Sequence, residues 1–249
     1  MTHGSYHREF SHALGRDMEF KVFGHGGQPC LVFPTQNGRF FDYQDHGMVE
    51  VLRPWLDAGR LQLFCLDSVD EHSWSDVGGD LAARMELQEQ FHRYVVEEMA
   101  PRAQWWSRTD RPKLWVTGNS MGGFHAAISF FRRPDLFSTM VALSGLFEGS
   151  HFVGDNRGGR AHDNSPAWFV DAMPDDHPWL DQYRQGRIVA AVGQGAWEEE
   201  LLASTRWMDE VLTRRGVDHQ FEYWGHDVSH DWHWWHRMMT KLFGELMPW

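Results

Sequence analysis

The pentapeptide Gly118-Asn119-Ser120-Met121-Gly122 constrains the fold most, because it reads G-x-S-x-G between two segments of different type. Residues 113–117 before it are apolar and typical of a short strand, and residues 123–131 after it predict a helix. A serine on so sharp a turn needs small neighbours, since its backbone has positive φ and larger side chains would collide with strand and helix. The pattern therefore predicts that Ser120 projects into a cleft as a nucleophile, with the Met121 amide at a helix N-terminus as an oxyanion donor.

Composition limits the classes of protein that this chain can represent. With 249 residues and 42% hydrophobic content, it can form one large α/β domain over residues 1–249. The net charge of −12 argues against nucleic acid or an anionic membrane as a partner. We find no transmembrane or secretory segment and expect a cytoplasmic protein, in which Cys30 and Cys65 are buried thiols rather than a disulfide.

Strand-like and helix-like segments alternate along the chain, which predicts a mostly parallel sheet with helices on both faces. Two strands flanking Gly15-Arg16-Asp17 indicate an antiparallel N-terminal hairpin at the sheet's edge. An insertion is expected around residues 148–180, where residues 148–166 lack any period and predict a loop or lid. The predicted strands are 8–14, 19–23, 30–33, 61–66, 113–117, 139–144, 187–192 and 220–224. The predicted helices are 47–58, 81–99 (ending before Pro101), 123–131, 197–215 and 232–246.

A histidine that serves such a serine should follow a late strand at the same sheet edge. Strand 220–224 is followed by a histidine-rich segment, in which His230 lies at the junction between loop and final helix. We favour His230 as the general base and keep His226, nearer the strand, as the alternative.

The histidines at positions 230, 233 and 236 also raise the possibility of a metal site. Steps of three residues drift around a helix, and no H-E-x-x-H motif or cysteine pair supports a site. We therefore predict no metal and no cofactor.

The acid of the site is the least determined member. Strand 187–192 is followed by Gly193-Gln194-Gly195, and the next position, where a G-x-x-D pattern would place aspartate, is Ala196. The next carboxylates are three consecutive glutamates, residues 198–200, and glutamate can orient a histidine as aspartate does when its geometry is correct. We favour Glu198, closest to the strand, with Glu199 as the alternative.

These segments together resemble the putative-esterase group of α/β-hydrolases, which includes S-formylglutathione hydrolases, feruloyl and acetyl esterases, and mycolyltransferases. The resemblance covers most of the chain and rests on L-G-R-D-M at residues 14–18, the strand end at 32–34, the serine motif, and H-D-W-H-W-W at residues 230–235. The last run is similar to the H-S-W-x-Y-W that follows the catalytic histidine of mycolyltransferases, and it favours His230. Those enzymes also use a glutamate shortly after a G-N-G turn, which is similar to Gly193-Gln194-Gly195.

The resemblance further implies an α/β-hydrolase fold and a second oxyanion amide after strand 30–33. Aligned with the family's L-x-G-L turn, residues 33–36 indicate Gln36 beside Met121, although Thr35 replaces the glycine and leaves Asn37 as an alternative.

We predict a serine carboxylesterase that acts on a small ester through Ser120, His230 and Glu198. Trp74, Trp168 and Trp197 are candidate walls of an apolar substrate pocket, although core packing explains tryptophans equally well. An acyltransferase with the same triad and a catalytically silent binding protein of the same fold are the alternatives.

Overall fold

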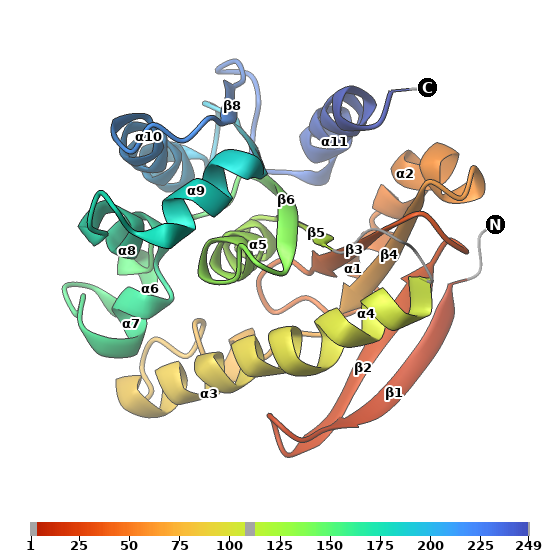
Figure 1. The fold of residues 1–249 in the computed structure, drawn as a ribbon, viewed down its shortest axis with the longest axis horizontal. Coiled ribbons are helices and arrows are strands. Elements are labelled where there is room, and N and C mark those ends of the chain that lie inside the picture. The colour runs from red at the N-terminus through yellow and green to blue at the C-terminus, as the bar shows by residue number, and fades with distance from the viewer. Residues whose placement is uncertain (1–3, 108–112, 249) are drawn as a thin grey trace.

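Within residues 4–107 and 113–248, which a computed structural model describes, eight strands form one sheet in the order β1-β2-β4-β3-β5-β6-β7-β8. The pairs β1–β2 and β2–β4 are antiparallel, and every later pair is parallel. This arrangement confirms the predicted α/β-hydrolase sheet with its N-terminal hairpin (Figure 1). The strands are β1 (Ser5–Ser11), β2 (Arg16–Phe23), β3 (Gln28–Phe33), β4 (Leu61–Leu66), β5 (Leu114–Asn119), β6 (Phe137–Leu143), β7 (Arg187–Val192) and β8 (Gln220–Tyr223).

Helices cover both faces of the sheet because alternate strand residues point to opposite faces. On β3, Leu31 and Phe33 join a core on one face of the sheet, whereas Cys30 and Val32 join a second core on the other face. Cys30 and Cys65 are free and buried, as predicted, and burial raises the pKa of both thiols. The helices are α1 (Asp42–Asp45), α2 (Met48–Asp57), η1 (Asp70–His72), α3 (Leu81–Arg93), η2 (Tyr94–Met99), α4 (Ala100–Ser107), α5 (Met121–Arg132), α6 (Ser150–Val153), α7 (Gly159–Asp163), α8 (Pro166–Ala172), α9 (Pro178–Gln185), α10 (Glu199–Arg214) and α11 (Trp232–Leu246).

The helix predicted to end before Pro101 continues through it, so this boundary is wrong. A π-helical segment, η2, follows α3 and leads directly into α4, in which Pro101 is the second residue. Proline cannot donate a backbone hydrogen bond, and its ring crowds the carbonyl four residues earlier in a regular α-helix. The wider π turn immediately before Pro101 relieves that conflict without ending the helix.

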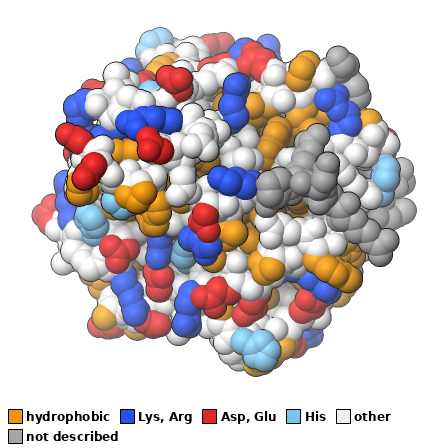
Figure 2. All heavy atoms as spheres, in the orientation of Figure 1, with side chains coloured by type: hydrophobic (Ala, Val, Ile, Leu, Met, Phe, Trp, Pro, Cys, Tyr) orange, Lys and Arg blue, Asp and Glu red, His pale blue; other side chains and the backbone are white. Residues whose placement is uncertain are grey.

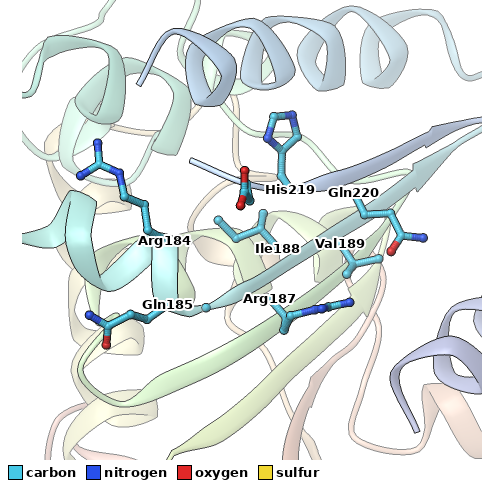
Figure 3. Close-up of a pocket in the computed structure, with 9 residues that line it drawn as sticks. Arg184, Gln185, Arg187, Ile188, Val189, His219 and Gln220 are labelled. Atoms are coloured by element: carbon cyan, nitrogen blue, oxygen red, sulfur yellow. The ribbon is translucent and has the colours of Figure 1, made fainter. Parts of the chain in front are cut away.

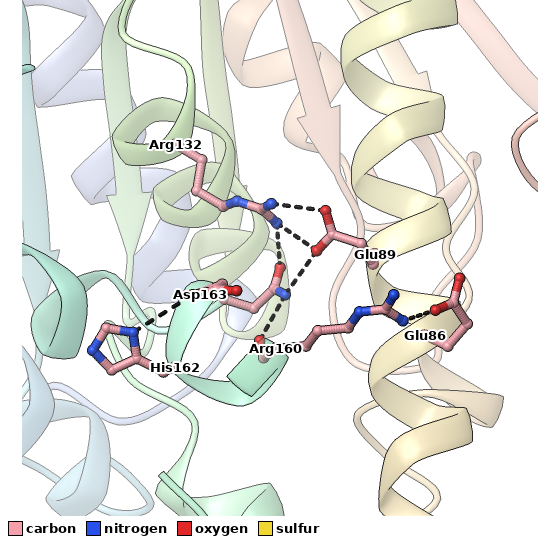
Figure 4. Close-up of polar contacts among 7 residues, drawn as sticks. Glu86, Glu89, Arg132, Arg160, His162 and Asp163 are labelled. Carbon is pink, nitrogen blue, oxygen red and sulfur yellow. Dashed lines mark hydrogen bonds and ion pairs between the residues drawn. The ribbon is translucent and has the colours of Figure 1, made fainter. Parts of the chain in front are cut away.

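The region predicted as a loop contains the short helices α6 and α7, with α8 and α9 after them. Helices of four and five residues give no readable period, which explains the wrong prediction. A polar network fastens this region to the body of the protein (Figure 4). Arg132 at the end of α5 donates to Glu89 of α3 and to Asn164, and Asn164 also donates to Glu89. Burial alone would raise the pKa of the Glu89 carboxyl. The contacts with Arg132 and Asn164 have the larger effect, so the pKa is lowered overall.

The surface carries charges of both signs. Figure 2 shows Lys and Arg side chains interspersed with Asp and Glu over one face of the molecule. Among the described residues, no helix has the length and apolar character needed to cross a membrane.

Candidate active site

The turn that carries Ser120 lies between the end of β5 and the start of α5, as the sequence predicts. Ser120 has φ 55° and ψ −124°, in the strained conformation that this kind of turn requires. A Cβ atom on Gly118 would lie 2.3 Å from the carbonyl carbon of Gly122, and one on Gly122 would lie 2.3 Å from the carbonyl oxygen of Phe33. Both glycines are therefore needed for the backbone to approach itself this closely.

His230 faces Ser120, with 2.9 Å between its Nε2 and the serine Oγ. The backbone amide of His230 donates to the carbonyl of Ala196 at 3.0 Å, and its ring packs edge-on against Trp235. His226, the alternative, is exposed and does not line the cavity beside Ser120. The structure thus brings His230, and not His226, to the serine.

Glu198 lies on the far side of the histidine and is completely buried. Its Oε2 is 3.4 Å from Nδ1 of His230, an ion-pair distance slightly longer than a normal hydrogen bond. Within the described residues, neither of these two atoms has another hydrogen-bond partner. Because an unpaired buried carboxylate is costly, the pair is best described as one contact that a small closure would complete. Glu199 and Glu200 are exposed.

Two residues that the sequence did not single out hold Glu198 in place. Ser144 donates from its Oγ to Oε1 of Glu198 at 2.6 Å and accepts a bond of 3.1 Å from the indole of Trp235. Ser144 follows β6 directly and has φ 45°. The sequence signals are weak: a serine at the end of a strand and one tryptophan of an aromatic run.

A cavity of about 310 Å³ opens beside Ser120. Ten residues line it: Gln36, Ser120, Met121, Leu146, His151, Phe152, Trp197, Glu200, Leu201 and His230. Both predicted oxyanion residues are among them, whereas Asn37 is not. Among the described residues, the amides of Gln36 and Met121 have no protein acceptor, and the Gln36 side chain donates to Ser75 at 2.9 Å.

The three predicted pocket tryptophans have different positions. Trp197 lines the cavity and is 79% exposed. Trp74 and Trp168 do not line it, which corrects their assignment as pocket walls. Both are buried in an apolar cluster, where Trp74 contacts Phe124 and Phe152. A large aromatic side chain gains most by such complete burial, so core packing accounts for these two.

A second cavity of about 340 Å³ lies near the amino ends of β7 and β8, at the opposite edge of the sheet from Ser120. Figure 3 shows its lining residues, among them Arg184, Arg187 and His219. The described residues that line it include no serine, cysteine or threonine, so we do not consider it a candidate site for acyl transfer to a side chain.

The histidines at positions 230, 233 and 236 have separate partners. His230 contacts Ser120, His233 packs against the ring of Trp234, and His236 bonds to the carbonyl of His46. Across residues 4–107 and 113–248, no three His, Cys, Asp or Glu side chains are grouped so that they could hold a metal ion.

Comparison with solved structures shows the same fold in several other proteins. A ferulic acid esterase superposes with a TM-score of 0.76 at 16% identity, covering 96% of this chain and 95% of that one. An S-formylglutathione hydrolase from Agrobacterium tumefaciens gives 0.74 at 16% identity, covering 98% and 95%. MPT51 (FbpC1) from Mycobacterium tuberculosis gives 0.72 at 13% identity, covering 97% of each chain. Identities this low show the fold alone.

No curated protein sequence matches this chain significantly. The family model described as "Putative esterase", however, matches residues 11–246, which is nearly the whole chain. This chain therefore belongs to the putative esterase family of α/β-hydrolases, as its sequence motifs indicate.

Proposed function

We propose that this protein is a serine carboxylic-ester hydrolase in which Ser120 is the nucleophile, His230 the general base and Glu198 the acid that orients it. One observation carries the proposal. The Ser120 Oγ lies 2.9 Å from His230 Nε2 at the wall of a cavity, and Glu198 is buried directly behind the histidine.

The proposed reaction has two halves. Ser120 Oγ attacks the ester carbonyl while its proton passes to His230 Nε2, and the amides of Gln36 and Met121 stabilise the oxyanion. Collapse of the tetrahedral intermediate breaks the bond to the alcohol, which leaves with the proton from His230. Water then gives up a proton to His230, attacks the acyl-serine and releases the acid, and the proton returns to Ser120 Oγ.

Glu198 acts through His230. A carboxylate beside Nδ1 selects the tautomer that leaves Nε2 free to accept the serine proton, and it stabilises the imidazolium that forms. Complete burial keeps this carboxylate from turning toward water, and the Ser144 hydroxyl fixes its other oxygen. An acyltransferase would use the same acyl-enzyme with an alcohol in place of water.

The test is labelling with a fluorophosphonate probe followed by peptide mapping, together with hydrolysis of p-nitrophenyl acetate and butyrate. We expect the label on Ser120, and we expect Ser120→Ala to lose labelling and to reduce kcat/KM by roughly 10⁴-fold or more. Ser138→Ala is the matched control, because Ser138 lies near the amino end of β6, at the opposite edge of the sheet from Ser120. This variant should keep both the labelling and the activity. A Ser120→Ala protein that retains more than about a tenth of the activity would exclude this mechanism, and absence of labelling would favour a silent binding protein.

A further inference from the structure

The cavity beside Ser120 has a neighbour with which it shares a wall. The neighbouring cavity measures about 420 Å³ and includes Ala203 and Trp207 of α10. Three residues line both cavities: Leu146, His151 and Glu200. These side chains therefore form the partition between the two spaces.

A short contact between two side chains joins that partition from two different elements. His151 of α6 places its Nδ1 2.5 Å from Oε2 of Glu200, which is in the first turn of α10. Both side chains are substantially exposed, at 46% and 66%. An exposed pair of this kind changes an equilibrium constant by about fivefold at most, so the partition is held together weakly.

The far cavity offers apolar contact surface beyond this pair. Two of its polar residues are already engaged, since Glu148 accepts from the Ser150 amide and Ser204 accepts from the Phe147 amide, each at 2.8 Å. Leu146, Ala203 and Trp207 remain as the available apolar surface. The near cavity alone, about 310 Å³, is at the lower end of the roughly 300–1,000 Å³ typical of small-molecule sites.

We propose that the His151–Glu200 pair makes this enzyme favour esters with short chains, by limiting the ester's apolar chain to the near cavity. This inference rests on the proposed function, since it concerns the same site. Esters with short chains fit beside Ser120, whereas a longer chain enters the far cavity only when the pair separates. The long chain belongs to either the acyl or the alcohol part, and the two are distinguished by experiment.

The experiment measures kcat/KM along two series of substrates. One series is p-nitrophenyl esters from acetate through butyrate to octanoate, and the other is alkyl acetates of increasing alcohol length. The variants are Glu200→Ala and His151→Ala, which open the partition from either side. Glu199→Ala is the matched control, because Glu199 is the adjacent exposed glutamate and lines neither cavity.

We expect the octanoate-to-butyrate ratio, or its equivalent among the alcohols, to rise about three- to fivefold in both variants, because a long chain then no longer has to separate a pair of about that strength. Glu199→Ala should keep the wild-type ratio. A rise in the acyl series assigns the partition to the acyl chain, and a rise in the alcohol series assigns it to the alcohol. The inference is wrong if both variants keep ratios within twofold of wild type in both series while butyrate hydrolysis and Ser120 labelling persist. Absence of butyrate hydrolysis and of Ser120 labelling in the wild-type protein would instead refute the proposed function.

Discussion

The two halves of the candidate active site are built by different means. In the half that carries Ser120, backbone packs against backbone: Gly118 lies against Gly122, and Gly122 against the carbonyls of Phe33 and Pro34. Five consecutive residues define the turn, and the strand and helix on either side keep it in place. The position of Ser120, the proposed nucleophile, is therefore encoded locally.

In the half that carries Glu198, side chains do the positioning. The carboxylate takes a hydrogen bond from Ser144, which takes one from Trp235, and His230 lies edge-on to the same tryptophan. These residues come from the end of β6, the start of α10, the loop after β8, and α11. Backbone bonds from Gly195 to Val228 and from His230 to Ala196 join the two loops.

The comparison explains how a glutamate can occupy this position. Glutamate has one more rotatable bond than aspartate, so its carboxylate needs an additional fixed contact to be held at the histidine. Ser144 supplies that contact at 2.6 Å, in a buried setting where a hydrogen bond to a charged group is strong. The half that carries Ser120 needs no such support from distant side chains.

The largest effect should come from the residue that joins the two halves. His230→Ala removes the proton acceptor, and we expect kcat to fall by roughly 10⁴-fold or more, as for Ser120→Ala. The double variant should be hardly slower than either single variant, because the two residues act as a unit. Stopped-flow or steady-state hydrolysis of p-nitrophenyl butyrate measures both.

His226→Ala is the control for that experiment, since His226 is exposed and lies in the same loop. It should retain most of the activity. An inactive His226→Ala beside an active His230→Ala would mean that the observed Ser120–His230 contact is not the catalytic one.

Glu198→Gln should have the next largest effect. The amide keeps the size of the side chain but favours the wrong tautomer of His230, so we expect kcat to fall by about 10²- to 10⁴-fold with little change in KM. Glu199→Gln, one residue along the helix and exposed, should lie within about twofold of wild type. If the two variants were equally active, the acid would have to come from another residue.

Sequence was sufficient where one residue pattern dictates one backbone geometry. The G-x-S-x-G turn, the strand before it, the helix after it and the N-terminal hairpin follow from steric limits that act over a few residues, and the structure has them all. The first strand does lie three residues earlier than predicted, because the turn occupies residues 12–15.

Sequence was insufficient where geometry depends on packing between distant segments. No local sequence pattern shows that Ser144 and Trp235 lie together beside Glu198, since Ser144 and Trp235 are 91 residues apart along the chain. Tryptophans give the same signal whether they wall a pocket, as Trp197 does, or fill a core, as Trp74 does. Helices α6 and α7 are too short to produce a period, and the π segment before Pro101 is a local adjustment that no propensity indicates.

A backbone change in the half that carries Ser120 should have a smaller effect on activity than Glu198→Gln, but still a large one. In Gly122→Ala, the new Cβ would lie 2.3 Å from a backbone carbonyl oxygen, so the turn must shift. Displacement of a catalytic atom by about 1 Å can lower the rate about 10²-fold, and we expect a loss of that order together with a lower Tm. Gly78→Ala is the control, since a Cβ there has open space. Wild-type activity in Gly122→Ala would show that the turn is not held by backbone contact.

The smallest effect should come from Ser144→Ala, which tests whether side-chain contacts position the carboxylate in the half that carries Glu198. Ser144 does not line the cavity beside Ser120, and its side chain bonds to Glu198 and Trp235, so we expect it to be a positioning residue. Its loss should lower kcat about tenfold and leave KM nearly unchanged. It should also cost stability, because the buried Trp235 indole loses its acceptor. Trp235→Phe removes only the indole donor and should be milder. A merely structural Ser144 would lower activity by the same factor in any background, whereas a Ser144 that acts through Glu198 should have almost no effect on kcat in the Glu198→Gln protein. Additive losses in that double-mutant cycle would separate Ser144 from catalysis and leave Glu198 positioned by burial alone.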